Sequence, residues 1–214
     1  ICFDKRKTHR FFQSIGVETP ELFDPEKIKG DLSAKYPFIL KPADGSSSKG
    51  VTRVYNEKEL CFFLDYVPNP ILQEMVYGQE YTLDVLADFQ GSVRCVVPRL
   101  RIETRAGEVS KGMTVKKREL IEAGKRVVEA LPGARGCITV QCFVTPGDVI
   151  KFIEINPRFG GGIPLSLKAG ADFPRWIIEM VCGCNPDIEM DGWKDGLVML
   201  RYDEAIYVDK EDIL

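Results

Sequence analysis

Four segments of the chain alternate apolar and polar residues, and they occur as two consecutive pairs with a short turn inside each pair. They are residues 80–88 with 92–103, and residues 138–144 with 149–156. Alternation with a period of two is typical of a strand that buries one face, and two such strands around a short turn form an antiparallel hairpin. The sequence therefore predicts two long antiparallel hairpins, and any fold for this chain has to contain them.

Helices are predicted around these hairpins, and shorter strands before them. Helical spacing of apolar residues or a capping-box signature marks residues 5–15, 116–131 and 173–183, and a helix that begins after Asn56 with Glu59 at its third position. The shorter strands are expected at residues 36–42, 51–55 and 71–75. Helices beside antiparallel hairpins indicate the α+β class. Because short strands give way to long hairpins near Val76, we expect two units, residues 1–76 and 77–214.

Composition narrows the classes of function. The 214 residues are 44% hydrophobic and 29% charged, which is ordinary for a soluble globular protein. A net charge of -3 gives no reason to expect nucleic acid or an anionic membrane as a partner, and no apolar run could span a bilayer, so a cytoplasmic protein is expected. His9 is the only histidine, which argues against Cys-His and Ser-His-Asp catalysis. The chemistry is expected to use carboxylates, amides, lysines and arginines.

The segment IEIN places a carboxylate and an amide on one face of a predicted strand. If facing residue numbers in the second hairpin sum to 293, Gln141 opposes Phe152. Gln141, Glu154 and Asn156 then share one face, while Ile153 points to the other. One carboxylate and two amide oxygens are ligands that Mg²⁺ accepts, with Mn²⁺ as an alternative. The other interpretation is a solvated sheet face.

The segment FILKPADGSSSKGV, residues 38–51, joins an apolar strand to a polar loop. Lys41 ends the strand, where an ammonium group is costly to bury unless an anion meets it. The three serines between Gly45 and Gly50 offer consecutive backbone N–H donors and hydroxyl groups, which favours a phosphate-binding loop. A flexible turn, with a lysine that reaches solvent, is the alternative.

The segment ILQEMVYGQEYTLDV, residues 71–85, leaves a gap between two predicted strands. The backbone groups of Glu74, Met75 and Val76 are expected to lack strand partners there. Unpaired backbone beside apolar side chains suits a flat purine ring, and Glu80, a few positions on, suits ribose hydroxyl groups.

Taken together and in this order, the three segments resemble the ATP-grasp superfamily, in particular the branch similar to one ATP-binding half of the carbamoyl phosphate synthase large chain. Biotin carboxylase and D-alanine–D-alanine ligase are other members with this kind of glycine-rich loop. The resemblance covers nearly the whole chain, and its most specific part is Gln141 followed by EINPR at residues 154–158. It implies the ATP-grasp fold, in which two α+β subdomains hold ATP between antiparallel sheets.

The resemblance also implies a part for individual residues. For ATP it implies phosphate contacts from Lys5 and Lys41, a lid of Asp44, Gly45, Ser46, Ser47, Ser48, Lys49 and Gly50, an adenine-binding linker of Glu74, Met75 and Val76, and a ribose contact from Glu80. For magnesium it implies Gln141, Glu154 and Asn156, with Arg158 and Lys41 as the catalytic residues.

The activity implied by the resemblance is ligation that depends on ATP and Mg²⁺. A substrate carboxylate attacks the γ-phosphate, and an amine or a thiol displaces phosphate from the acyl phosphate that results. Two alternatives keep the same ATP site: a non-catalytic ATP-binding module or subunit of a larger or split enzyme, and a kinase-like phosphotransferase.

Two departures from the family bear on partners and substrates. The family carries a preceding α/β domain of very roughly a hundred residues, and we expect this N-terminal domain, missing from the sequence, to be a partner. A homodimer is a further expectation. GEVSKG at residues 107–112 stands where carbamoyl phosphate synthase has a His-Thr-Gly-Asp element, which argues against synthesis of carbamoyl phosphate. Small-molecule carboxylates and amines are the expected substrates.

The segment RLRIETRAGEVSKG supplies candidates for contact with the substrate. Arg99, Arg101 and Lys111 are candidates to hold a carboxylate or a phosphate, and an ordinary solvent-facing strand is the alternative. Gly161 and Gly162 are expected to let the backbone approach the substrate closely, although a simple tight turn would also explain them.

Overall fold

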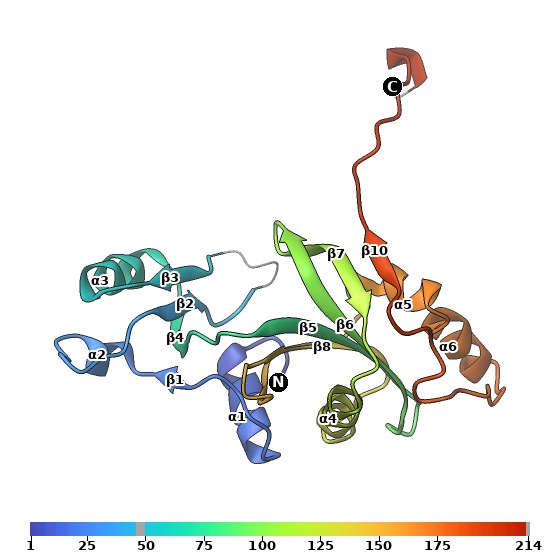
Figure 1. Cartoon of the computed structure of the whole chain (residues 1–214), viewed down its shortest axis with the longest axis horizontal. Coiled ribbons are helices and arrows are strands. Elements are labelled where there is room, and N and C mark those ends of the chain that lie inside the picture. The colour runs from blue at the N-terminus through green and yellow to red at the C-terminus, as the bar shows by residue number, and fades with distance from the viewer. Residues whose placement is uncertain (46–49, 213–214) are drawn as a thin grey trace.

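The protein folds into two antiparallel sheets that lie side by side, as the computed structural model in Figure 1 shows for residues 1–45 and 50–212. The small sheet has the order β1 (Leu22–Phe23), β4 (Pro70–Glu74), β2 (Phe38–Pro42), β3 (Thr52–Val54). The large sheet has the order β10 (Val198–Leu200), β7 (Glu108–Thr114), β6 (Val93–Arg105), β5 (Gln79–Ala87), β8 (Gly136–Val144), β9 (Ile150–Asn156). The α+β class is confirmed, and the two predicted hairpins are β5–β6 and β8–β9.

The helices cover the sheets unevenly. They are α1 (Lys5–Ser14), α2 (Pro25–Ile28), α3 (Glu57–Tyr66), α4 (Arg118–Glu129), α5 (Ile163–Lys168), α6 (Phe173–Val181) and the 3₁₀ turn η1 (Lys210–Asp212). Helices α1 and α4 lie below the large sheet in Figure 1, whereas α2 and α3 accompany the small sheet. The upper face of the large sheet, toward the small sheet, is therefore left open for a site.

The helix starts follow the sequence signals. The Asp4 carboxylate accepts hydrogen bonds from the backbone N–H groups of Arg6 and Lys7, at 2.8 and 3.2 Å, and so caps α1. Asn56 caps α3 by accepting from the Glu59 N–H at 3.0 Å, and the Glu59 carboxylate reaches back to the Tyr55 N–H at 2.9 Å. The predicted helix starts are confirmed at both places.

Each sheet has its own hydrophobic core. Phe38, Leu40 and Leu72 belong to the core of the small sheet, which α3 completes. The larger core lies under the large sheet and includes Phe11 and Phe12 of α1. A division at Val76 remains a proposal, and α1 packs with the large sheet although it precedes that position.

The register of the second hairpin differs from the prediction. Gln141 faces Glu154 directly, and a bulge at Ile153 shifts the rest of β9, so that Phe152 faces Cys142 instead. A bulge puts two residues of one strand opposite a single residue of its partner. Phe152 is consequently buried in the core, and Ile153, expected to face the core, lines the open side with Glu154. The predicted facing sum of 293 was wrong, because alternation alone cannot locate an extra residue.

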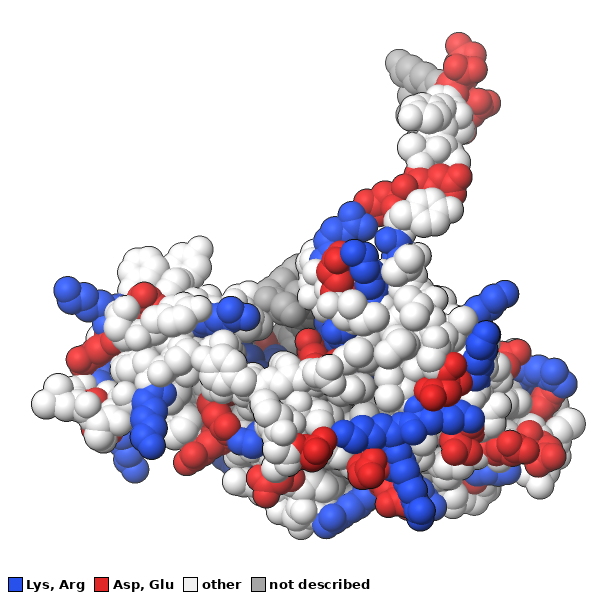
Figure 2. Space-filling view, in the orientation of Figure 1, with Lys and Arg blue, Asp and Glu red and all other residues white. Residues whose placement is uncertain are grey.

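The chain continues past β10 as an extended segment that leaves the body of the molecule, at the top of Figure 1. Figure 2 shows acidic and uncharged residues along this segment, while basic and acidic side chains intermix over the body. The first part of this segment is held by an ion pair between Asp203 and Arg105 of the β6–β7 hairpin, with contacts of 2.7 and 3.2 Å. Within residues 1–45 and 50–212, no helix combines the length and apolar character needed to cross a membrane.

Candidate functional site

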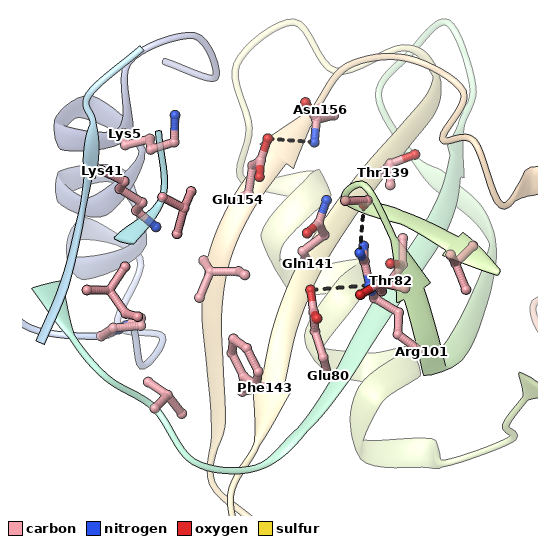
Figure 3. Close-up of a pocket in the computed structure, with 18 of the residues that line it drawn as sticks. Lys5, Lys41, Glu80, Thr82, Arg101, Thr139, Gln141, Phe143, Glu154 and Asn156 are labelled. Atoms are coloured by element: carbon pink, nitrogen blue, oxygen red, sulfur yellow. Dashed lines mark hydrogen bonds and ion pairs between the residues drawn. The ribbon is translucent and has the colours of Figure 1, made fainter. Parts of the chain in front are cut away.

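A cleft of about 760 Å³ lies between the two sheets and gathers residues from distant parts of the sequence. Figure 3 shows Lys5 and Lys41 on one side, and Glu80, Gln141 and Glu154 on the large sheet opposite them. The predicted site residues that line the cleft are Lys5, Lys41, Gly45, Glu74, Met75, Val76, Glu80, Arg99, Arg101, Gln141, Glu154, Asn156, Arg158, Gly161 and Gly162. Segments more than a hundred residues apart thus converge on one site.

Some predicted residues are not part of this lining. Asp44 and Gly50, the two ends of the predicted lid, are exposed and do not line the cleft. Lys111 lies outside it and forms an ion pair with Glu103 at 2.6 Å. Ser46, Ser47, Ser48 and Lys49 lie outside the described residues.

The side chain of Lys41 points into the cleft because side chains along β2 alternate between the two faces of the strand. Phe38 and Leu40 point into the small core, so Ile39 and Lys41 point the other way and line the cleft. The pKa of Lys41 is lowered to about 8, chiefly by burial and also by the nearby Lys5 ammonium, while the Glu154 carboxylate acts in the opposite direction. The site therefore holds a cation at an energetic cost that a bound anion would remove.

The start of α1 is tied to the end of β2. The Lys5 backbone N–H donates to the Ala43 carbonyl at 2.8 Å, and the Lys5 ammonium donates to the Gly45 carbonyl at 3.1 Å. Lys5 thus stands beside the loop that follows β2, close enough to Lys41 to influence its pKa. Two ammonium groups at one end of the cleft form a suitable site for phosphate oxygens.

Gln141, Glu154 and Asn156 share the cleft face, as the alternation predicted. Gln141 faces Glu154 across the β8–β9 ladder, and Asn156 Nδ2 donates to Glu154 Oε1 at 3.0 Å. Three oxygen-bearing side chains on adjacent positions fit a hard cation such as Mg²⁺, and rotation of the Asn156 amide would turn its oxygen toward the same point. In the described part of the chain no group of three or more His, Cys, Asp or Glu residues could hold a metal ion.

Glu80 lies at the start of β5, within the electrostatic reach of Glu154. Its carboxylate is 3.3 Å from Arg101 Nε, while Arg101 Nη2 donates to the Gly107 carbonyl at 2.9 Å. Burial raises the pKa of Glu80, the Arg101 guanidinium lowers it, and Glu154 raises it. A polar ligand that hydrogen bonds to the Glu80 carboxylate would offset this burial.

Arg99 has a different environment from the one expected of a substrate contact. It is 1% exposed, and its Nε and Nη2 atoms donate to the Asp84 carboxylate at 2.7 and 2.9 Å. Ser166 of α5 donates to the same carboxylate at 2.6 Å. The bidentate edge of the guanidinium is thus occupied, and the pair links β5, β6 and α5 beneath the cleft.

The glycines after Arg158 make room for side chains of the protein itself. A Cβ at Gly162 would collide with Arg99 Nη1, and a Cβ at Gly161 would collide with Glu108 Oε2. Thr139 donates to the Arg158 carbonyl at 2.9 Å and so fixes the start of this loop, residues 158–162. The buried Arg99 therefore explains the glycine at position 162, whereas the exposed Glu108 side chain could turn away from a Cβ at position 161.

The connection between the sheets passes along the cleft. Within the described residues, Met75 and Val76 form no backbone hydrogen bond, as the sequence predicted. The same prediction was wrong for Glu74, which ends β4 opposite Phe38 and donates its N–H to the Glu21 carbonyl at 2.8 Å. The Glu74 carboxylate forms an ion pair with Lys151 of β9, with contacts of 2.5 and 2.7 Å, which holds the two sheets together. A Cβ at Gly78 would collide with the Val144 carbonyl, so the backbone passes directly against the end of β8.

Several cleft residues were missed from the sequence. Phe143 and Thr139 share the face of Gln141, and Ile39 shares the face of Lys41. Strand alternation would have found all three, because each lies two positions from a residue that was identified. Gly78 and Ile153 had no such signal. Gly78 lines the cleft because its backbone passes against the end of β8, and Ile153 lines it because of the bulge in β9.

Comparison with known proteins finds a matching family and several similar sequences. Residues 2–162 match the family model described as an ATP-grasp domain. The D-alanine–D-alanine ligase of Fusobacterium nucleatum is 33% identical over 170 residues, which cover 75% of this chain and 58% of that protein. The 3-methyl-D-ornithine–L-lysine ligase of Methanosarcina acetivorans is 28% identical over 169 residues, 78% of this chain and 42% of that protein. The chain thus spans about half the length of these curated relatives.

Solved structures share the fold. The biotin carboxylase domain of Hydrogenobacter thermophilus 2-oxoglutarate carboxylase, in complex with MgADP, ADP and bicarbonate, superposes with a TM-score of 0.75 at 20% identity, covering 88% of this chain and 47% of that one. The L-amino acid ligase from Bacillus licheniformis gives a TM-score of 0.64 at 23% identity, covering 83% and 47%. Identities this low show a common fold alone.

Proposed function

The chain belongs to the ATP-grasp domain family, and we propose that it is the ATP- and Mg²⁺-binding part of a ligase that activates a carboxylate as an acyl phosphate for attack by an amine. The observation that carries this proposal is the cleft in which Lys41, the Gln141–Glu154–Asn156 face and Arg158 meet. The ligase names of the relatives agree with it. In this proposal residues 1–76 and 77–214 form the two halves that hold the nucleotide.

Each group in the cleft has a chemical part in the proposed reaction. Lys5 and Lys41 bind phosphate oxygens at the end of the cleft where both ammonium groups lie. The backbone of Met75 and Val76, which has no described partner, hydrogen bonds to adenine, and Glu80 accepts from the ribose hydroxyls. These contacts fix the nucleotide so that its γ-phosphate lies toward the large sheet.

The face formed by Gln141, Glu154 and Asn156 would hold the ion that balances the remaining negative charge of the phosphates. Gln141, Glu154 and Asn156 would hold Mg²⁺, with Mn²⁺ as a substitute, and the bound ion neutralises charge on the phosphates. Arg158 is exposed and its Nη1 donates to the Phe159 carbonyl at 3.0 Å, which leaves other N–H groups for the phosphoryl group that is transferred. The carboxylate oxygen attacks phosphorus, ADP leaves, and the amine then attacks the acyl carbon and releases phosphate.

A substrate screen on the full-length protein tests this function. We expect release of ADP that requires Mg²⁺, a carboxylate and an amine together. Formation of AMP would contradict transfer of the γ-phosphoryl group. ATP binding without turnover on any carboxylate would instead indicate a binding module, and ADP release with hydroxyl acceptors alone would indicate a kinase.

Replacement of Arg158 separates catalysis from binding. We expect Arg158→Ala to reduce turnover by about 10²-fold or more, as removal of a transition-state contact does, with the Kd for ATP changed less than about twofold. Arg175→Ala is the matched control, because Arg175 is exposed on α6, pairs with Glu179 and does not line the cleft. Equal turnover in the two variants would remove Arg158 from the mechanism.

A further inference from the structure

The carboxylate of Glu108 is the acidic group in the cleft to which neither the fold nor the proposed ATP site gives a purpose. It lines the cleft at the start of β7, where the β6–β7 hairpin turns through Ala106 and Gly107, both with positive φ. It lies against Gly161, since a Cβ at Gly161 would collide with Glu108 Oε2. The hairpin tip thus brings an acid directly over the loop of residues 158–162.

The other acids of the cleft are engaged. Glu74 pairs with Lys151, Glu80 lies beside Arg101, and Glu154 accepts from the Asn156 amide. Among the residues that the structure describes, none forms a hydrogen bond or an ion pair with the Glu108 carboxylate. A carboxylate in this position attracts a cation from solution.

The natural partner of Glu108 is directed elsewhere. Arg105 faces Glu108 across the hairpin, where opposite charges would normally pair. The Arg105 guanidinium instead binds Asp203, with contacts of 2.7 and 3.2 Å. Among residues 1–45 and 50–212, the Glu108 carboxylate is therefore left without a partner on the cleft side of the hairpin.

We propose that Glu108 binds the ammonium group of the amine that the ligase couples, takes one proton from it so that the nitrogen can attack the acyl carbon, and so selects acceptors that carry a primary ammonium group. This inference rests on the proposed function, because it assigns the acceptor end of the same cleft. Gly161 and Arg158 are three residues apart, so their backbones are at most about 11 Å from each other. Since Glu108 lies against the loop that carries Arg158, an amine held at Glu108 lies in the same part of the cleft as the carboxylate that is activated near Arg158.

Hydroxylamine allows the acceptor to be tested apart from activation. It is largely uncharged at neutral pH and traps acyl phosphates as hydroxamates, so it needs no ammonium site. The standard amino acids in both chiral forms serve as carboxylates with hydroxylamine, and the same compounds serve as acceptors with ADP release as the readout. Each assay is run on the full-length wild-type protein and on Glu108→Gln, which keeps the size of the side chain and removes its charge.

We expect Glu108→Gln to raise the KM for the amine acceptor at least about tenfold, as loss of a hydrogen bond to a charged group does, while hydroxamate formation and the KM for ATP stay unchanged. Glu108→Asp should recover part of the loss. Glu103→Gln is the matched control on the same hairpin, because Glu103 pairs with Lys111 outside the cleft, and it should behave as wild type.

Three results would overturn the proposal. Equal amine KM values in wild type and Glu108→Gln would show that the ammonium group is bound elsewhere. A parallel loss of hydroxamate formation would assign Glu108 to carboxylate activation and not to the acceptor. Absence of both hydroxamate and ADP in wild type with every carboxylate would contradict the proposed ligase function itself, and the acceptor site with it.

Discussion

Lys41 shows how one residue can connect the fold to the nucleotide. Strand alternation directs its side chain away from the Leu40 core and into the cleft, and burial lowers its pKa to about 8, well below the usual value for lysine. The residue is therefore half deprotonated in the free protein at a mildly alkaline pH. A phosphate group beside it would favour the ammonium form and raise the pKa again.

This pKa makes ATP affinity depend on pH in a defined direction. Below about pH 8 the free protein already carries the Lys41 ammonium, so affinity for ATP should vary little. Above pH 8, where ATP is fully ionised, Lys41 must take up a proton when ATP binds. The affinity for ATP should therefore fall by up to about tenfold per pH unit. Calorimetric titration of wild type in buffers of different ionisation enthalpy measures the proton uptake. Lys41→Arg keeps its charge and should show no such fall; the same pH dependence in both proteins would exclude Lys41 as the cause.

At the level of elements, the loop of residues 158–162 is shaped by what packs beneath it. Arg99 and Asp84 form a diagonal pair across β5 and β6, and Gly162 rests directly on the Arg99 guanidinium. Because Asp84 and Arg99 are both buried, their charges remain in the core only while they are paired. The loop that carries Arg158 thus takes its position from a buried ion pair.

Gly162→Ala tests this support. The new Cβ would meet Arg99 Nη1 and Val109 Cγ1, and we expect the free energy of unfolding to fall by about 1–3 kcal/mol, as overpacking does in a close-packed site. Turnover should fall as well, because Arg158 moves with the loop. Gly147→Ala is the control, since its Cβ would meet nothing nearer than Thr145 Oγ1 at 3.9 Å. Urea unfolding of the two variants that gave equal midpoints would contradict the packing argument.

Alternation predicted the faces of the strands but not every contact between them. It placed Glu154 and Asn156 on one face because side chains of a strand alternate, and Gln141 shares that face because its true partner, Glu154, lies two residues from the predicted one. It missed the bulge at Ile153, because an extra residue leaves no mark in the hydrophobic pattern. The packing of Gly161 against Glu108 was equally out of reach, since it depends on how a hairpin tip and a distant loop meet in space.

At the level of the whole molecule, two separate cores are joined by a short unpaired connection and a few polar contacts. The Glu74–Lys151 ion pair crosses from one sheet to the other, and Arg6 of α1 donates to the Pro70 carbonyl at 2.8 Å. The cleft between the cores is lined by Lys5 and Lys41 on one side and by the large sheet opposite them. A polyanion bound there would therefore contact both sheets at once.

Binding of a non-hydrolysable ATP analogue with Mg²⁺ should stabilise the whole chain. At a free concentration of 100 times its Kd, the analogue should raise the free energy of unfolding by about 2.7 kcal/mol. Hydrogen exchange should slow at Met75 and Val76, whose N–H groups have no partner among the described residues. Glu154→Gln should need a higher Mg²⁺ concentration for the same effect. An analogue that bound without slowing exchange in this connection would place adenine elsewhere.

The bulge at Ile153 also bears on how the length of this strand can change in evolution. Removing Ile153 would leave Phe152, Glu154, Ile155 and Asn156 in strict alternation, with each side chain still on its present face. Loss of Glu154 would keep the same alternation but would remove the carboxylate from the cleft, and loss of Phe152 or Ile155 would turn part of the strand around. In an alignment of related sequences, a one-residue gap in this strand is therefore expected at position 153 in preference to Phe152, Glu154 or Ile155.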